Sequence, residues 1–156
     1  MLSIQSIVLV AVQSQFTFKN CGTANHHIQL KGLKISPHPV LLPGLCTFEL
    51  LVNVSHDIIH PLQTKFDIKA KVLGFEVPIQ CEGTSGSCTH ADWCGTACTT
   101  CECPVKAGEQ TLTIPLEFKQ TLPLVSSGTV NSKIEYLSAT GQTGCIEVSN
   151  VQVRNK

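Results

Sequence analysis

The stretch KFDIKAKV at residues 65–72 alternates without interruption between charged side chains at its odd positions and apolar side chains at its even positions. This period of two predicts a β-strand with one face toward a core and the other toward water. Residues 111–118, TLTIPLEF, repeat the alternation. Because Pro115 within them cannot donate a ladder hydrogen bond, we expect this strand at a sheet edge or with a bulge.

Strands of the same kind are expected on both sides of these two. Apolar rows occur at 48–54 and 130–136, two short apolar runs flank Gly32, where we expect a bulge, and the last strands are expected at 145–148 and 151–153. Turn signals rich in Pro and Gly separate the runs, and no long stretch has a helical period. About seven or eight strands at this spacing predict an all-β sandwich or barrel.

The composition excludes several classes of protein. The chain has 156 residues, which suits one domain, and 42% of them are apolar, which is too many for a disordered chain. No apolar run approaches the ~20 residues of a membrane-spanning helix. Eleven Lys and Arg residues balance eleven Asp and Glu residues, so no strong field is available to hold nucleic acid or an anionic membrane by charge alone.

Nine cysteines in so short a chain indicate either disulfides in an oxidising compartment or metal ligation. Residues 1–14, MLSIQSIVLVAVQS, resemble a secretory signal peptide, with cleavage expected near Ser14 or Gln15 and a single mature domain at 16–156. The alternative, a buried first strand, leaves nine cysteines in a reducing cytosol without an explanation. Asn53 begins an N-glycosylation sequon, which fits secretion.

Several motifs occur in a characteristic order. They are FKNCG (18–22), LKISPHP (33–39), LLPG (41–44), the segment from Cys81 through GSCT (86–89) to Cys94, CECPVKAG (101–108) and GCIEV (144–148). Together they resemble the ML-domain (lipid-recognition) family over nearly the whole mature chain, most closely its ganglioside-activator branch. The first motif and Val77-Pro78 are also similar to the family's sterol carriers of the Niemann-Pick type.

The resemblance implies a cysteine pairing that the sequence alone does not choose. The implied pairs are Cys21–Cys145, Cys81–Cys88, Cys94–Cys103 and Cys98–Cys101, with Cys46 left as a free thiol. The first pair closes a loop of most of the chain, which contributes roughly 4–5 kcal/mol in the chain-entropy model. The chain departs from the ganglioside-activator pattern in a short Cys94–Cys98 spacer and a 72–76 loop without Trp, so the resemblance points to lipid in general.

The resemblance also implies an immunoglobulin-like, two-sheet antiparallel β-sandwich with an apolar cavity between its sheets. The residues expected to line this cavity are the inward members of the strands: Phe48, Leu50, Val52, Phe66, Ile68, Val72, Leu112, Ile114, Leu116, Phe118, Ile134 and Tyr136. Periodicity alone equally predicts a packed core, because alternation does not distinguish a filled sandwich from a hollow one. In a cavity, each methylene removed from water contributes about 0.8 kcal/mol, so a lipid tail needs no charged contact.

The implied function is that of a secreted or lysosomal protein that solubilises, transfers or presents a sphingolipid, phospholipid or sterol, as a sphingolipid activator does. A hydrolase or a receptor would be its protein partner. A sterol carrier of the Niemann-Pick type is the alternative within the family, and a receptor-binding module with incidental lipid is the alternative from another class. No GxSxG, HExxH or P-loop pattern occurs, so we expect neither an enzyme nor a cofactor.

Residues 72–75, VLGF, break the alternation of their strand and predict a hairpin tip at the mouth of the cavity. We expect Leu73, Phe75 and Trp93 to enter a bilayer interface transiently during lipid pick-up, since Trp favours that zone. Packing of the tip against a neighbouring loop is equally consistent with the sequence.

Two patterns have the residue types of metal sites. Cys94, Cys98, Cys101 and Cys103, with His90 nearby, could ligate zinc, but the apparent signal peptide favours a disulfide knot, and the CxxC pair lacks the βαβ context of a redox motif. His56 and His60 would share a face only on a helix, and a third ligand is missing, so we expect a surface loop and no metal. Histidines also permit a response to lysosomal acidity.

Overall fold

The computed structural model describes residues 16–23, 26–58, 61–83, 86–92, 105–139 and 141–156. These residues form ten strands and, within the described ranges, no helix. The strands are β1 (Thr17–Asn20), β2 (Ile28–Ser36), β3 (Val40–Leu42), β4 (Gly44–Val54), β5 (Gln63–Val72), β6 (Phe75–Pro78), β7 (Thr89–His90), β8 (Gly108–Phe118), β9 (Ser127–Ser138) and β10 (Gly141–Asn155). In the described part of the chain no helix is long and apolar enough to cross a membrane.

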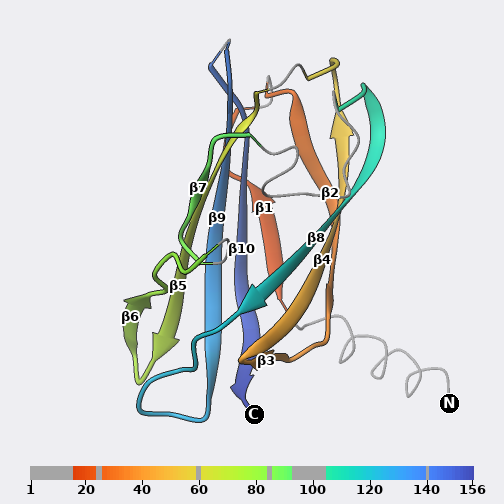
Figure 1. Cartoon of the computed structure of the whole chain (residues 1–156). Helices are drawn as coiled ribbons and strands as arrows, with labels where there is room; N and C mark the ends of the chain where they lie inside the picture. The colour runs from red at the N-terminus through yellow and green to blue at the C-terminus, as the bar shows by residue number, and fades with distance from the viewer. Residues whose placement is uncertain (1–15, 24–25, 59–60, 84–85, 93–104, 140) are drawn as a thin grey trace, which may run out of the picture.

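The strands form two facing sheets, so the prediction of an all-β sandwich is confirmed (Figure 1). The larger sheet has the order β1-β10-β9-β5-β6, with β3 also paired to β10 and β7 to β5. The smaller sheet has the order β2-β4-β8. Every pairing is antiparallel except that of β3 with β10.

The strands with the clearest sequence patterns behave as expected. Along β5 the side chains alternate between exposed and buried without a break, because its charged odd positions face water. In the described residues β8 pairs only with β4, which makes it an edge strand. Because no described strand lies on its outer side, Pro115, which has no N–H to donate, leaves no neighbouring strand there without a hydrogen bond. The register of β2 against β4 shifts between Leu30 and Gly32, where a bulge was expected.

The structure has more strands than the seven or eight expected, and the additional strands are short. β3, β6 and β7 have two to four residues each, too few for alternation to identify them. β3 has a further role, since it follows β2 and precedes β4 of the smaller sheet but pairs in parallel with β10 of the larger one. The chain thus crosses between the sheets twice at this end of the sandwich.

Two disulfides tie segments on the side of the larger sheet, and a pair of hydrogen bonds links the two sheets. The predicted disulfides Cys21–Cys145 and Cys81–Cys88 are both present, and the first joins residues 124 positions apart. Beside it, the Asn20 side chain links β1 to β2: its Oδ1 accepts from the Leu30 amide at 2.7 Å and its Nδ2 donates to the Leu30 carbonyl at 3.2 Å. These bonds satisfy the backbone of β2 next to its bulge.

The two ends of the sandwich differ in what they contain. The lower end of the sandwich, at the bottom of Figure 1, holds β3, the β5–β6 hairpin and the β8–β9 connection at residues 119–126. The opposite, upper end holds the turn between β9 and β10 and the connection from β4 to β5. The candidate site lies between the sheets toward the lower end.

Candidate functional site

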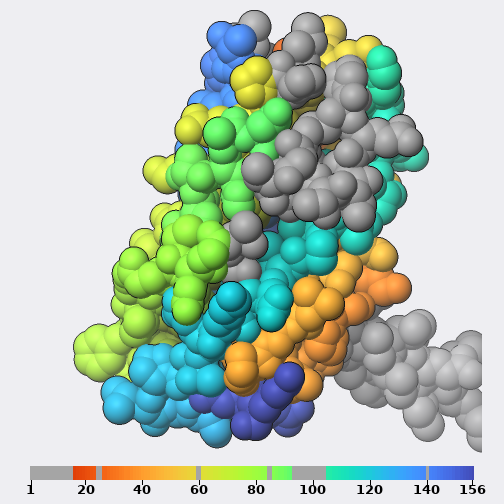
Figure 2. Space-filling model, in the orientation of Figure 1, coloured from red at the N-terminus to blue at the C-terminus, as the bar shows by residue number. Residues whose placement is uncertain are grey.

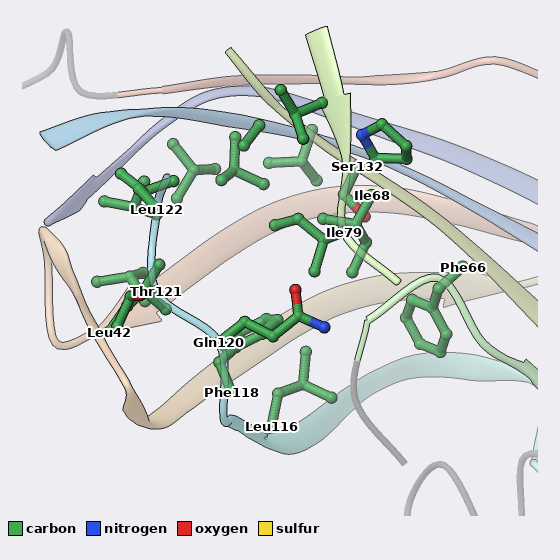
Figure 3. Close-up of a pocket in the computed structure, with 18 of the residues that line it drawn as sticks. Leu42, Phe66, Ile68, Ile79, Leu116, Phe118, Gln120, Thr121, Leu122 and Ser132 are labelled. Atoms are coloured by element: carbon green, nitrogen blue, oxygen red, sulfur yellow. The ribbon is translucent and has the colours of Figure 1, made fainter. Parts of the chain in front are cut away.

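An apolar cavity opens between the sheets at the lower end (Figure 3). Its lining residues are Val40, Leu42, Phe48, Phe66, Ile68, Ala70, Val77, Pro78, Ile79, Leu116, Phe118, Gln120, Thr121, Leu122, Pro123, Val130, Ser132, Val148, Val151 and Val153. In Figure 3, Leu42 and Leu122 lie toward one end of the cavity and Phe66 toward the other. The atom-free space is about 820 Å³, including solvent at the open side, and about 60 Å³ of it is wide enough for the centre of a water molecule.

The inner limit of the cavity follows from side-chain size along each strand. On β9, Val130 and Ser132 line the cavity, whereas Ile134 and Tyr136, next along the same inward row, do not. Ile134 and Tyr136 are 1% and 0% exposed. Large side chains thus fill the upper half, and smaller ones leave space in the lower half.

Residues after β6 form one wall of the cavity. The Ile79 amide donates to the Ile68 carbonyl at 2.9 Å, so the chain continues along β5 past the end of β6. The Ser87 hydroxyl accepts from the Ile68 amide at 2.9 Å and donates to the Ile68 carbonyl at 3.1 Å. The Cys81–Cys88 disulfide closes this loop, and Gly86 is required because any Cβ there, at φ +98°, would collide with the Gln80 carbonyl.

The β8–β9 connection forms the wall opposite. Asn155 at the end of β10 holds it with its side chain, since Oδ1 accepts from the Leu122 amide at 2.8 Å and Nδ2 donates to the carbonyls of Leu122 and Val125. These bonds keep Leu122 buried in the cavity, while Leu124, at φ +66°, is 89% exposed. Gln120 joins the two walls by donating from Nε2 to the Gln80 carbonyl at 3.2 Å.

Polar side chains are few in the cavity. They are Gln120 and Thr121 in the β8–β9 connection and Ser132 on β9, and no lining residue is charged. Ligand binding would therefore rest on the removal of apolar surface from water. The affinity should change little with pH, because no lining side chain carries a charge.

The predicted cavity residues divide into two groups. Phe48, Phe66, Ile68, Leu116 and Phe118 line the cavity. Leu50, Val52, Val72, Leu112, Ile114, Ile134 and Tyr136 are buried but lie outside its lining. Sequence analysis missed Ala70, Ser132 and the small valines of β10, whose only signal is their small size on an inward row. Burial raises the pKa of the Tyr136 hydroxyl.

The predicted tip is a two-residue hairpin turn. Leu73 and Gly74 have positive φ angles of 52° and 81°, as in a tight turn matched to the twist of its strands. Leu73 and Phe75 are 67% and 74% exposed. Leu124 belongs to the β8–β9 connection, and this connection adjoins the tip at the same end (Figure 2). Trp93 lies outside the described residues.

The remaining predicted residues lie away from the cavity lining. Cys46 is an unpaired, buried thiol on β4, and burial raises its pKa to about 12. Asn53 is exposed on the same strand. The pairs Cys94–Cys103 and Cys98–Cys101 lie outside the described residues and stay predictions.

The histidine pattern does not build a metal site in the part of the chain that is described. His56 stacks on His27 with ring centroids 4.8 Å apart and its Nδ1 lies 3.0 Å from the Ser55 hydroxyl, while His60 is outside the described residues. Among the described residues no group of three or more His, Cys, Asp or Glu side chains is arranged to hold a metal ion.

The chain is similar in sequence and in fold to known proteins. The sequence profile of the ML domain matches residues 15–151. The ganglioside GM2 activator of Macaca fascicularis is 29% identical over 154 residues, which span 86% of this chain and 81% of that protein. A phosphatidylglycerol/phosphatidylinositol transfer protein of Cryptococcus neoformans var. neoformans is 29% identical over 117 residues, 73% of this chain and 59% of that protein. A Niemann-Pick type C2 protein from Japanese carpenter ant shares the fold, with a TM-score of 0.55 at 15% identity, over 90% of this chain and all of that one.

Proposed function

We propose that this chain, which belongs to the ML-domain family of lipid-binding and lipid-transfer proteins, is a secreted or lysosomal carrier that takes a lipid from a membrane and presents it in water. The observation that carries the proposal is the apolar cavity between the sheets, whose lining holds no charged side chain. Such a cavity suits a hydrocarbon tail, because each buried methylene contributes about 0.8 kcal/mol. Carriage of the lipid, rather than its chemical conversion, is the proposed activity.

The first ligand class proposed is a sphingolipid or phospholipid, held by its tails. Similarity to a ganglioside GM2 activator and to a phospholipid transfer protein supports this class over a receptor-binding module without lipid. Only about 60 Å³ of the cavity is wide enough for the centre of a water molecule, so we expect the two walls to move apart when a tail enters. The Gln120–Gln80 hydrogen bond joins those walls and would break in that movement.

Secretion is part of the proposal. The signal-like segment 1–14, the disulfides Cys21–Cys145 and Cys81–Cys88, and an exposed sequon residue, Asn53, support an oxidising compartment. The lysosomal lumen or extracellular fluid would be the place of action.

The test is to secrete the protein from cultured cells, extract it and identify the co-purified lipid by mass spectrometry. We expect sphingolipid or phospholipid in near-stoichiometric amount, and transfer of that lipid between vesicles by the purified protein. Recovery of sterol in its place would assign the sterol-carrier alternative. Protein that contains no lipid and transfers none would contradict the proposal and favour a receptor-binding module.

Membrane contact is proposed to occur through the lower end. The β5–β6 tip projects there beside the 119–126 connection (Figure 2), and these two segments carry the exposed side chains of Leu73, Phe75 and Leu124. Apolar side chains at the rim would enter the bilayer while the cavity faces the lipid.

Replacing Leu73 and Phe75 together with Ser should weaken binding to neutral vesicles by at least about tenfold, since burying a large apolar side chain contributes about 1.5–3 kcal/mol. Leu51→Ser is the matched control, because Leu51 is also exposed, at 39%, but lies on β4 of the other sheet. Vesicle flotation measures both variants. Equal loss in the control, or no loss in the double variant, would contradict docking by the tip.

A further inference from the structure

Ser132 stands out among the side chains that line the cavity. It is 8% exposed, its hydroxyl makes no hydrogen bond to another described residue, and its oxygen keeps some accessible surface. The other polar lining residues, Gln120 and Thr121, lie in the β8–β9 connection, and Gln120 already donates to Gln80. The hydroxyl of Ser132 is therefore a polar group in an apolar cavity without a hydrogen-bond partner in the described part of the protein.

The register places Ser132 near the inner end of the cavity, one inward position before Phe66. It lies opposite Ile68 of β5 and Val148 of β10, so these three residues form one line across the larger sheet. The next inward residue of β9, Ile134, belongs to the filled half. Figure 3 shows Ser132 beside Ile68 and Ile79, away from Leu42 and Leu122.

A hydroxyl at this position is unfavourable unless water or a ligand in the cavity forms a hydrogen bond with it. The neighbouring inward positions carry Val130 and Ile134, which suit a buried strand and have no such cost. The hydroxyl takes its partner from the cavity, which is water when no ligand is bound and an oxygen of the ligand when one is.

We infer that Ser132 determines ligand specificity by hydrogen-bonding one hydroxyl or carbonyl oxygen that an otherwise apolar lipid carries close to the inner end of the cavity. The inference rests on the proposed function, because it assumes that a lipid occupies the cavity. A plain saturated tail leaves the Ser132 hydroxyl unpaired, whereas a lipid with an oxygen at that depth satisfies it. The oxygen can come from a hydroxylated acyl chain or from the hydroxyl of a sterol.

The test compares two variants of the same shape, Ser132→Thr and Ser132→Val, which differ only in the presence of the hydroxyl. Both are β-branched residues that suit a strand. The probes are two pairs of lipids, 12-hydroxystearic acid with stearic acid and cholesterol with 5-cholestene, each pair differing by one hydroxyl. Affinities are measured by displacement of a fluorescent fatty acid from the delipidated full-length protein.

We expect the wild type and Ser132→Thr to prefer the hydroxylated member of one pair by about 3–10-fold, the contribution of one buried neutral hydrogen bond, and Ser132→Val to show no preference. The pair that responds identifies the source of the oxygen. Ser149→Val is the control, because Ser149 also carries a hydroxyl on the larger sheet but does not line the cavity, and it should keep the preference.

The inference is overturned if the wild type does not discriminate within either pair, or if Ser132→Val discriminates as the wild type does. Either result leaves the proposed function standing, provided that the probes bind. If no probe binds to the wild type and no lipid co-purifies with it, the proposed function itself fails, and the inference fails with it.

Discussion

The upper and lower halves of the interior are built by the same strands but contain different side chains. In the upper half, Leu50, Ile114 and Tyr136 from three strands meet with no measurable exposure. In the lower half, the inward rows of β5 and β9 carry the smaller side chains of Ala70 and Ser132, which line a cavity. The upper half therefore acts as a packed core that keeps the sheets in register, while the lower half can accept a ligand without loss of the fold.

The largest difference is expected when the same side chain is truncated in each half. Ile114→Ala in the filled half should lower the free energy of unfolding by about 4–5 kcal/mol, and Ile68→Ala on the cavity wall by about 2–3 kcal/mol, because the second site already lacks some packing contacts. Urea unfolding followed by circular dichroism, with disulfides intact, measures both. Equal costs would show that the lower half is as tightly filled as the upper half.

Added volume should follow the same ranking, with the larger cost in the filled half. A Cβ at Gly144 would lie 3.0 Å from the Ile28 Cβ and 3.2 Å from Tyr136 Cδ2, so Gly144→Ala should cost about 1–3 kcal/mol in the filled half. Ala70→Leu, on the cavity wall, should cost less than about 1 kcal/mol and should reduce lipid transfer, since the new side chain takes the place of the tail. Thermal unfolding and a vesicle-to-vesicle transfer assay measure the two effects. Undiminished transfer by Ala70→Leu would place the lipid elsewhere.

The smallest effect concerns Cys46, a buried residue of β4 outside the cavity lining. Its thiol is fully buried, with a pKa of about 12 against an ordinary value of 9.0, so the folded state retains the proton over a range in which the unfolded state loses it. The stabilisation that this thiol contributes to the folded state is fully present below pH 9. It decreases as the pH rises toward 12, and the free energy of unfolding falls by about 1.4 kcal/mol between pH 8 and pH 10.

The Cys46→Ala variant supplies the reference, because it keeps every other titration and removes this one. The difference in unfolding free energy between wild type and variant, followed from pH 8 to pH 10, isolates the thiol. Native protein should also react very slowly with iodoacetamide at pH 8. Rapid reaction would mean that solvent from the cavity reaches Cys46.

Much of the fold was predictable because its signals are local. The alternation in 65–72 identified β5, Pro115 indicated an edge strand, and Gly32 marked a bulge. The turn at Leu73 was visible as a break in alternation. The pairing of β3 with β10 was not predictable, because three residues carry no periodic signal and their partner lies more than a hundred positions away.

Only part of the candidate site was predictable from such local signals. Alternation identifies inward residues, and Phe48 and Ile68 were found by it, but it selected Leu50 and Ile134 with equal weight although these belong to the filled half. Ser132 was passed over because a polar residue on an apolar row reads as an interruption of the row. Its role depends on whether another residue forms a hydrogen bond with its hydroxyl, and no sequence pattern shows that.

The sequence by itself determined which side chains face inward, since the direction of a side chain on a strand depends only on its position within that strand. It also determined that nine cysteines require an oxidising compartment or a metal, which chemistry dictates without a fold. Whether the space between the sheets is filled or hollow was decided only by the tertiary structure. That space depends on the summed volumes of side chains from β4, β5, β8, β9 and β10, which meet only when the two sheets pack.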